Sequence, residues 1–177
     1  MPAMRKPFVA ALLFAALAVG APASAAVSPS ASSPEATASG LIVPQGSIRG
    51  VKVGMTYAQV LDKLGQPSSN KATTHPILGQ TRTLRYGQLT VTIDGRAGTS
   101  LVTSVMTVSR SDRTSSGLGV GSTEKQLRAG LKGLKCETSL GYRTCRLGVL
   151  RAGRLVTDFS ISRGGKVKRI SLGRVID

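Results

Sequence analysis

A short segment that occurs twice constrains the fold of this chain more than any other feature of its sequence. GVKVGMTYAQV at 50–60 aligns without a gap with GLGVGSTEKQL at 117–127. The shared frame is G-x-x-V-G-x-T-x-x-Q-[VL]. Because similarity at a fixed period marks repeated structural units, we interpret the chain as a tandem duplication.

The frame predicts where a helix begins in each copy. Thr56 stands three residues before Gln59, and Thr123 stands three residues before Gln126, which is the spacing of a capping box. In that motif the Thr hydroxyl accepts from the N–H of the third helical residue, and the Gln side chain accepts from the N–H of the Thr. Apolar residues follow at helical spacing, Val60 with Leu64 and Leu127 with Leu131. We therefore expect a short amphipathic helix in each copy.

The glycines of the second segment resemble a phosphate-binding loop, but the motif is incomplete. A Walker loop needs a lysine directly after its last glycine. Here Gly121 is followed by Ser122, and Glu124 would repel a phosphate at the start of the helix. The first copy also carries Lys52 where the second has Gly119. We therefore expect no nucleotide and no cofactor.

Segments rich in Val, Ile and Thr follow each predicted helix and are typical of strands. They span 81–86, 89–94 and 101–108 in the first copy, and 142–147, 155–162 and 166–172 in the second. In the last strand of each copy two apolar residues stand three apart, which predicts a bulge: Val102 with Val105, and Val167 with Ile170. The polar stretch from Pro67 to Gly79, which holds the single histidine, His75, predicts a loop.

These elements predict an α+β protein of two tandem modules. Each module combines a short helix or helical hairpin with a three- to four-stranded antiparallel sheet. We place the first module at 47–112 and the second at 113–177. Residues 26–46 are rich in Ala, Ser and Pro and predict a disordered tether before the first module.

The amino-terminal residues predict export. Arg5 and Lys6 precede an apolar run at 8–19, and the sequence Ala-Ser-Ala follows at 23–25. This pattern is that of a secretory signal peptide, which we assign to residues 1–25. The apolar run is shorter than the roughly 20 residues that a membrane span needs. We therefore expect a secreted or extracytoplasmic protein with no transmembrane segment in the mature chain.

The chain has two cysteines, Cys136 and Cys145. In an exported chain we expect them to form a disulfide. Their spacing is not C-x-x-C, and the one histidine lies far away in sequence, so we expect no metal site and no redox pair. The carboxylates are scattered and no G-x-S-x-G motif is present, so no set of catalytic residues is predicted.

The repeated frame and the residues that follow it resemble those of a known family. The frame G-x-x-V-G-M-T-x-x-Q-V, followed by Leu64-Gly65-Gln66-Pro67 and strands ending in V-x-x-[IV], resembles the small module of outer-membrane assembly lipoproteins of the SmpA/OmlA type. Its duplication on a secreted chain with a cysteine pair resembles the β-lactamase inhibitory proteins of actinomycetes. The resemblance implies tandem helix-plus-sheet modules and a protein-binding role.

The chain is strongly basic, with a formal net charge of +16. Such a charge raises encounter rates with acidic partners. Few aromatic residues accompany the basic ones, so stacking platforms for nucleic acid are lacking and no nucleic-acid partner is expected. The basic residues that we assign to a candidate acidic-partner patch lie in or near the second copy: Lys125, Arg128, Lys132, Arg143, Arg146, Arg151, Arg154, Lys166, Lys168 and Arg169.

These observations favour an exported, non-enzymatic module that binds an extracellular or envelope protein, in the manner of an inhibitor. A basic cell-envelope protein that holds anionic cell-wall polymers is the alternative. An extracellular enzyme is a third reading. The oligomeric state stays open.

Overall fold

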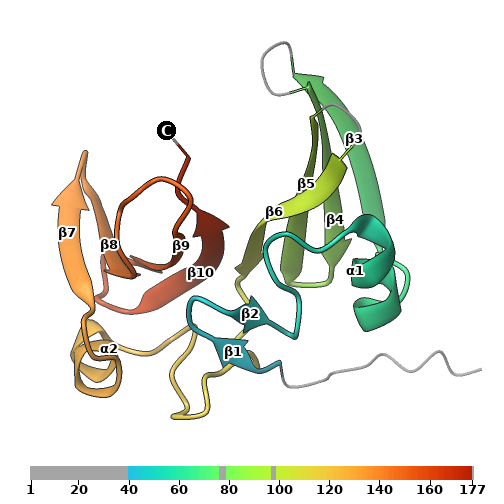
Figure 1. Ribbon diagram of the computed structural model, residues 1–177. Coiled ribbons are helices and arrows are strands. Elements are labelled where there is room, and N and C mark those ends of the chain that lie inside the picture. Colours follow the sequence, from blue (N-terminus) through green and yellow to red (C-terminus); the bar gives the residue numbers. More distant parts are fainter. Residues whose placement is uncertain (1–39, 76–78, 97–98, 177) are drawn as a thin grey trace, which may run out of the picture. The chain divides into compact units, whose positions relative to one another are not determined.

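The computed structural model describes residues 40–75, 79–96 and 99–176 (Figure 1). The predicted signal peptide and the predicted tether up to residue 39 lie outside these residues. Within the described part, no helix is both long enough and apolar enough to cross a membrane.

Strands dominate the described chain, and most of them belong to one antiparallel sheet. Its eight strands follow the order β3-β4-β5-β6-β10-β9-β8-β7. In chain order they are β3 (Ser69–His75), β4 (Gly79–Tyr86), β5 (Leu89–Arg96), β6 (Thr99–Thr107), β7 (Lys135–Ser139), β8 (Tyr142–Leu147), β9 (Leu155–Ile161) and β10 (Val167–Arg174). A separate two-stranded sheet joins β1 (Ile42–Val43) to β2 (Ser47–Ile48).

The prediction of an α+β fold with two helix-plus-sheet modules is wrong. The protein is mostly β, with two short helices in its described part, α1 (Tyr57–Leu64) and α2 (Glu124–Gly130). The strands after α1 and those after α2 do not form two sheets, because β6 pairs with β10. In this pairing Ser104 lies opposite Gly173, and Thr107 lies opposite Ile170. Strand-pairing between segments this far apart leaves no periodic trace in the sequence, so the pattern of local elements does not reveal it.

Both helices begin at the predicted threonines. The Oγ1 atom of Thr56 accepts from the N–H of Gln59 at 3.3 Å, and the Gln59 side chain accepts from the N–H of Thr56 at 2.9 Å. Thr123 and Gln126 make the same two contacts at 3.2 and 2.8 Å. Each helix buries one residue fully, Val60 in α1 and Leu127 in α2. Two capping boxes therefore fix where the helices start.

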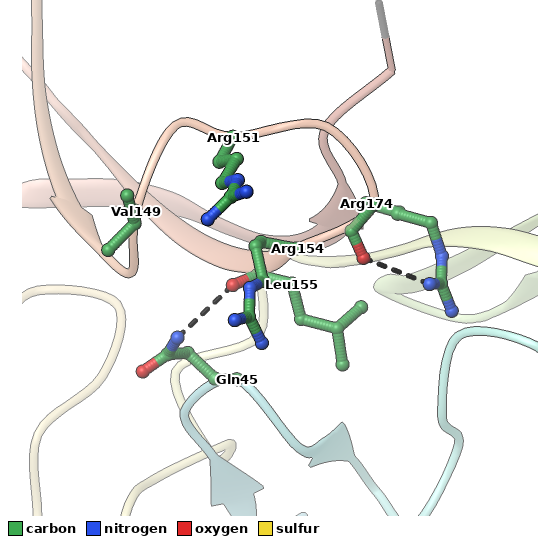
Figure 2. A pocket seen from close by; sticks show the side chains of 7 residues that line it. Gln45, Val149, Arg151, Arg154, Leu155 and Arg174 are labelled. Atoms are coloured by element: carbon green, nitrogen blue, oxygen red, sulfur yellow. Dashed lines mark hydrogen bonds between the residues drawn. The ribbon is translucent and has the colours of Figure 1, made fainter.

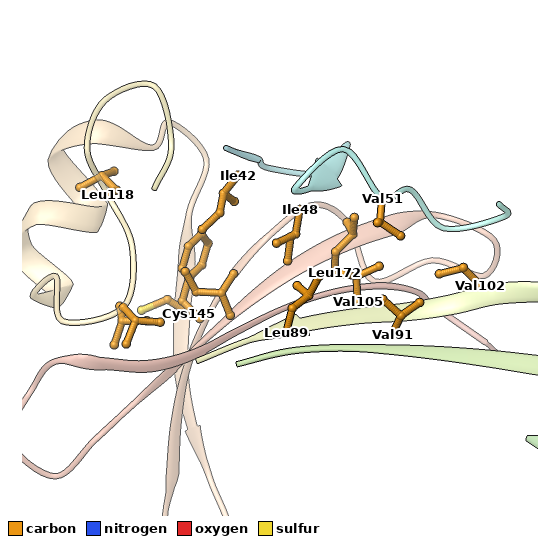
Figure 3. Packing of buried hydrophobic residues seen from close by; sticks show 14 of the residues in the cluster. Ile42, Ile48, Val51, Leu89, Val91, Val102, Val105, Leu118, Cys145 and Leu172 are labelled. Atoms are coloured by element: carbon orange, nitrogen blue, oxygen red, sulfur yellow. The ribbon is translucent and has the colours of Figure 1, made fainter. Parts of the chain in front are cut away.

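One face of the large sheet carries the hydrophobic core. Cross-strand partners form a continuous apolar row on this face, which includes Leu84, Val91, Val105 and Leu172. Ile42, Ile48 and Val51 from the segment around β1 and β2 pack onto the row (Figure 3). Val60 and Leu127 bring both helices to the same core. We call this side of the sheet the core face.

Both predicted bulges are present. The register between β5 and β6 shifts after Thr92: Thr92 pairs with Ser104, but Ile93 pairs with Val102. A second shift falls between Val167 and Arg169 on β10. An extra residue resets the alternation of side chains, so two apolar residues three apart both point into the core.

Residues 40–46, which we predicted as the end of a disordered tether, instead form a strand and a turn. Ile42 is 1% exposed, and its N–H donates to the carbonyl of Arg113 at 2.8 Å. Behind this hairpin the buried Asp112 accepts from the Nε of Arg49 at 2.8 Å and from the hydroxyl of Thr107. The apolar run Leu41-Ile42-Val43 has enough β-propensity to pair and pack, despite its Ser- and Pro-rich surroundings.

Two further strands differ from the sequence analysis. β3 covers most of the predicted loop from Pro67 to Gly79, and the backbone of His75 closes it by pairing with Gly79. β7 lies at the opposite edge of the sheet and pairs with β8. Both are polar edge strands, and an edge strand with little apolar residue content gives a weak alternation signal.

Removing either cap tests the helix starts. Thr56→Ala and Thr123→Ala each lose the acceptor for one helical N–H, so each should lower the free energy of unfolding by about 0.5 to 2 kcal/mol. Thr56→Ser and Thr123→Ser keep the hydroxyl and should cost less than their alanine counterparts. Urea unfolding measures these differences; equal stability of the alanine and serine variants would reject the capping assignment.

Candidate functional site

The second half of the chain holds an ion cluster beside the disulfide. The disulfide predicted between Cys136 and Cys145 is confirmed, and it joins directly opposed residues of β7 and β8. The Glu124 carboxylate lies within 4.8 Å of both sulfurs. It also accepts from Arg143 at 2.7 Å and from Arg128 at 2.8 Å. The sulfurs are bonded to each other, so this cluster offers no thiolate to a metal.

These contacts lower the pKa of Glu124. The hydrogen bond from Arg143 is the largest cause, and the contact with Arg128 adds to it, so that the pKa falls from 4.5 to about 2. Partial burial acts in the opposite direction but is outweighed. Glu124 therefore stays charged and ties α2 to β8.

The side of the large sheet opposite the core face, which we call the second face, is polar. Side chains alternate along a strand, so the neighbours of buried Val105 (Ser104 and Met106) lie on the second face and are half-buried. Short hydroxyl side chains fill much of it: Thr81, Thr83, Thr90, Thr92, Ser104, Thr144, Ser160 and Ser171. Among the described residues, both helices and the β1–β2 hairpin contribute to the core on the other side. The second face is therefore a broad surface on which many of the side chains are short and carry a hydroxyl group.

Charged residues lie among these hydroxyls. Arg146 donates to Asp158 at 2.6 Å and lies 3.7 Å from Glu137. Arg169 donates to Ser160 at 3.4 Å. The cations on this face that make no ion pair within the described chain are Lys71, Arg85, Lys135 and Arg169. The second face is thus polar with a basic excess.

The β7–β8 hairpin ends in an exposed apolar tip. Leu140 is 93% exposed and has φ +48°, and Gly141 follows with φ +78°. Tyr142, the next residue, is 70% exposed and shares the second face with Thr144 by alternation. A leucine in the left-handed region costs roughly 1 to 2 kcal/mol. Strain of this kind concentrates at functional sites.

A hollow lies where the β8–β9 loop meets the end of β10. Its volume is about 570 Å³, and Arg151, Arg154 and Arg174 contribute to its wall (Figure 2). The other lining residues are Gln45, Val149, Gly153 and Leu155. We call it the arginine hollow.

The basic residues of the predicted patch lie in several different places. Arg128 and Arg143 bind Glu124, and Arg146 binds Asp158. Arg151 and Arg154 line the arginine hollow. The remaining members are exposed and lie on α2, just after it, or around the turn into β10: Lys125, Lys132, Lys166, Lys168 and Arg169. Basic residues that are close in sequence therefore lie in separate clusters in the folded chain.

Leu140, Gln45 and Arg174 were not among the predicted site residues. A signal for the tip exists in Ser-Leu-Gly-Tyr at 139–142, since a glycine between two polar strands marks a tight turn. Gln45 reaches the hollow from the other half of the chain, by a contact that the local sequence does not encode.

The Glu124 cluster predicts a specific acid dependence. Because the folded pKa lies below the unfolded one, the stabilisation is complete above about pH 4.5 and is lost as the pH falls toward 2. Glu124→Gln should lower the free energy of unfolding at pH 6 by about 1 kcal/mol, since the cluster is partly solvated. The difference from the unmodified protein should vanish near pH 2 in urea unfolding. Glu137→Gln, which removes the same charge from an exposed side chain, controls for net charge; a constant difference at all pH values would contradict the assignment.

Comparisons with known proteins assign no family. No family model matches the chain, and no curated protein matches it. Among solved structures, a crystal structure of a cysteine-rich secretory protein from Staphylococcus aureus subsp. aureus Mu50 matches with a TM-score of 0.43 and 12% identity. The match covers 74% of this chain and 48% of that one, so the chain spans about half the length of that protein. A likeness this weak assigns neither family nor function, and the resemblance to assembly lipoproteins and β-lactamase inhibitory proteins stays a prediction.

Proposed function

We propose that this chain is an exported, non-enzymatic module that binds an acidic protein through the second face of its sheet and the β7–β8 tip. The observation that carries the proposal is the exposed, strained Leu140 at the edge of a broad polar face. The partner surface would be acidic and would offer an apolar recess to Leu140 and Tyr142.

Rigidity supports a role in protein binding. The second face belongs to a sheet whose other side is packed against a continuous core, so its short Ser and Thr side chains lose little entropy when a partner covers them. Hot spots favour Tyr and Arg, and Tyr142 and Arg169 both lie on this face. Its unpaired cations match an acidic partner, in agreement with the net charge of +16.

The acidic residues support a non-enzymatic role. Within the described chain, Glu124, Asp112 and Asp158 each accept from an arginine. For Glu124, the hydrogen bond from Arg143 lowers the pKa to about 2, which makes this carboxylate a poor general base. The contacts of these three carboxylates are ion pairs that join different parts of the fold.

The disulfide supports an extracytoplasmic location. Disulfides persist in oxidising compartments, and Cys136 and Cys145 are paired. The signal-peptide pattern at 1–25 agrees with export. The proposed location is therefore the medium or the cell envelope.

Leu140→Gly separates binding from stability. Glycine adopts a positive φ without strain, so the variant should melt at an unchanged or slightly higher temperature. Loss of a hot-spot side chain should weaken binding of the partner by about 30-fold, equivalent to about 2 kcal/mol. Calorimetric titration with a purified secreted or envelope protein, first identified by capture on the mature chain, measures the change.

Ile176→Ala is the matched control, because Ile176 is 80% exposed and lies outside the second face and the tip. It should leave the affinity unchanged. Equal affinity of Leu140→Gly and the unmodified protein would contradict the proposal. Binding only to anionic polymer, lost as salt rises to about 0.3 M, would instead favour the polymer-binding alternative.

A further inference from the structure

The arginine hollow is a separate site from the second face, and its lining includes Gln45 of the β1–β2 hairpin. Gln45, in the turn of that hairpin, donates from its backbone N–H to the Oγ1 of Thr157 at 2.7 Å. Its side-chain amide donates to the carbonyl of Leu155 at 3.1 Å (Figure 2). The hairpin therefore closes one wall of the hollow.

The opposite wall is a loop held by backbone hydrogen bonds. The N–H of Gly153 donates to the carbonyl of Val175, and the N–H of Val175 donates to the carbonyl of Arg154, both at 2.9 Å. Arg174 donates from Nη1 to the carbonyl of Gly153 at 2.9 Å. These contacts tie the residues between β8 and β9 to the end of β10, so the arginines project from a fixed frame.

Gly148 makes the close approach of the two walls possible. Its φ is +112°, and a Cβ atom there would lie 2.8 Å from the Nε2 of Gln45 and 2.7 Å from the carbonyl of Leu155. A larger residue would push the loop away from the hairpin. The shape of the hollow thus depends on a glycine.

The charge in the hollow is uncompensated within the described chain. None of its lining residues carries a carboxylate. No acidic side chain of the described residues lies within 4.0 Å of the guanidinium groups of Arg151, Arg154 and Arg174. An anion that enters the hollow would be stabilised by the uncompensated positive charge of the arginines that line it.

From this arrangement we infer that the arginine hollow binds a phosphate ester. Guanidinium groups bind phosphate oxygens bidentately, and a phosphate offers enough oxygens for more than one arginine. The volume of about 570 Å³ leaves room for more than the phosphate, and Val149 and Leu155 offer an apolar wall to the remainder of the ligand. A free phosphorylated small molecule and a phospholipid headgroup present the same chemistry.

Titration with glycerol phosphate and with vesicles of equal parts phosphatidylcholine and phosphatidylglycerol tests the site and separates these sources. The titrations use the mature chain in about 0.15 M salt, where the charge of distant residues is screened beyond about 8 Å. Arg151→Gln and Arg154→Gln should each weaken the binding of at least one probe by about tenfold, because each removes a charge-assisted contact. Both side chains are exposed, so the melting temperatures should stay unchanged.

Two control variants distinguish a site from general attraction. Arg163→Gln removes the same charge from the exposed turn between β9 and β10 and should change the affinity less than about twofold, as expected for a screened surface charge. Arg154→Lys keeps the charge but loses the planar fork, and should bind nearly as weakly as Arg154→Gln. If Arg151→Gln and Arg154→Gln weaken the binding of glycerol phosphate, the ligand is a soluble phosphate ester. If they weaken only the binding of vesicles, the ligand is a lipid headgroup. Absence of binding in both arms, or an equal effect of Arg163→Gln, would overturn the inference.

Discussion

The antiparallel pairing of β6 with β10 is the contact on which the rest of the structure depends. It joins the strands that follow α1 to those that follow α2, through partners such as Val105 and Leu172. These two residues are buried on the core face, where the β1–β2 hairpin packs over the junction (Figure 3). Without this pairing, each half would have two free sheet edges, and unpaired edges favour aggregation.

The same pairing makes two different surfaces from one sheet. The core face takes both helices and the hairpin, and at its margin the turn around Gln45 closes the arginine hollow. Within the described part of the chain, the helices and the hairpin leave the second face uncovered, and the β7–β8 tip with Leu140 lies beside it. A protein partner and a phosphate ester would therefore bind at separate sites, and the two proposals stand or fall separately.

The sequence predicts the local elements of this fold well and its assembly poorly. Capping and bulges are local, and Thr56, Thr123 and the spacing of Val102 and Val105 are sufficient to identify them. The single sheet depends on the contact between β6 and β10, which no short-range pattern encodes. The site shows the same division. The sequence shows where the basic residues are, but it does not show which arginines pair with a carboxylate. That depends on the strand register, which places Arg146 beside Asp158.

Amide hydrogen exchange measured by NMR tests the central claim, that one continuous sheet spans both halves of the chain. If β6 and β10 are paired at its centre, their slowest amides should exchange with the same free energy as those of β5 and β9, because the junction opens only when the whole sheet unfolds. Faster exchange along β6 and β10, with β5 and β9 still protected, would show two separately folded halves and contradict the account.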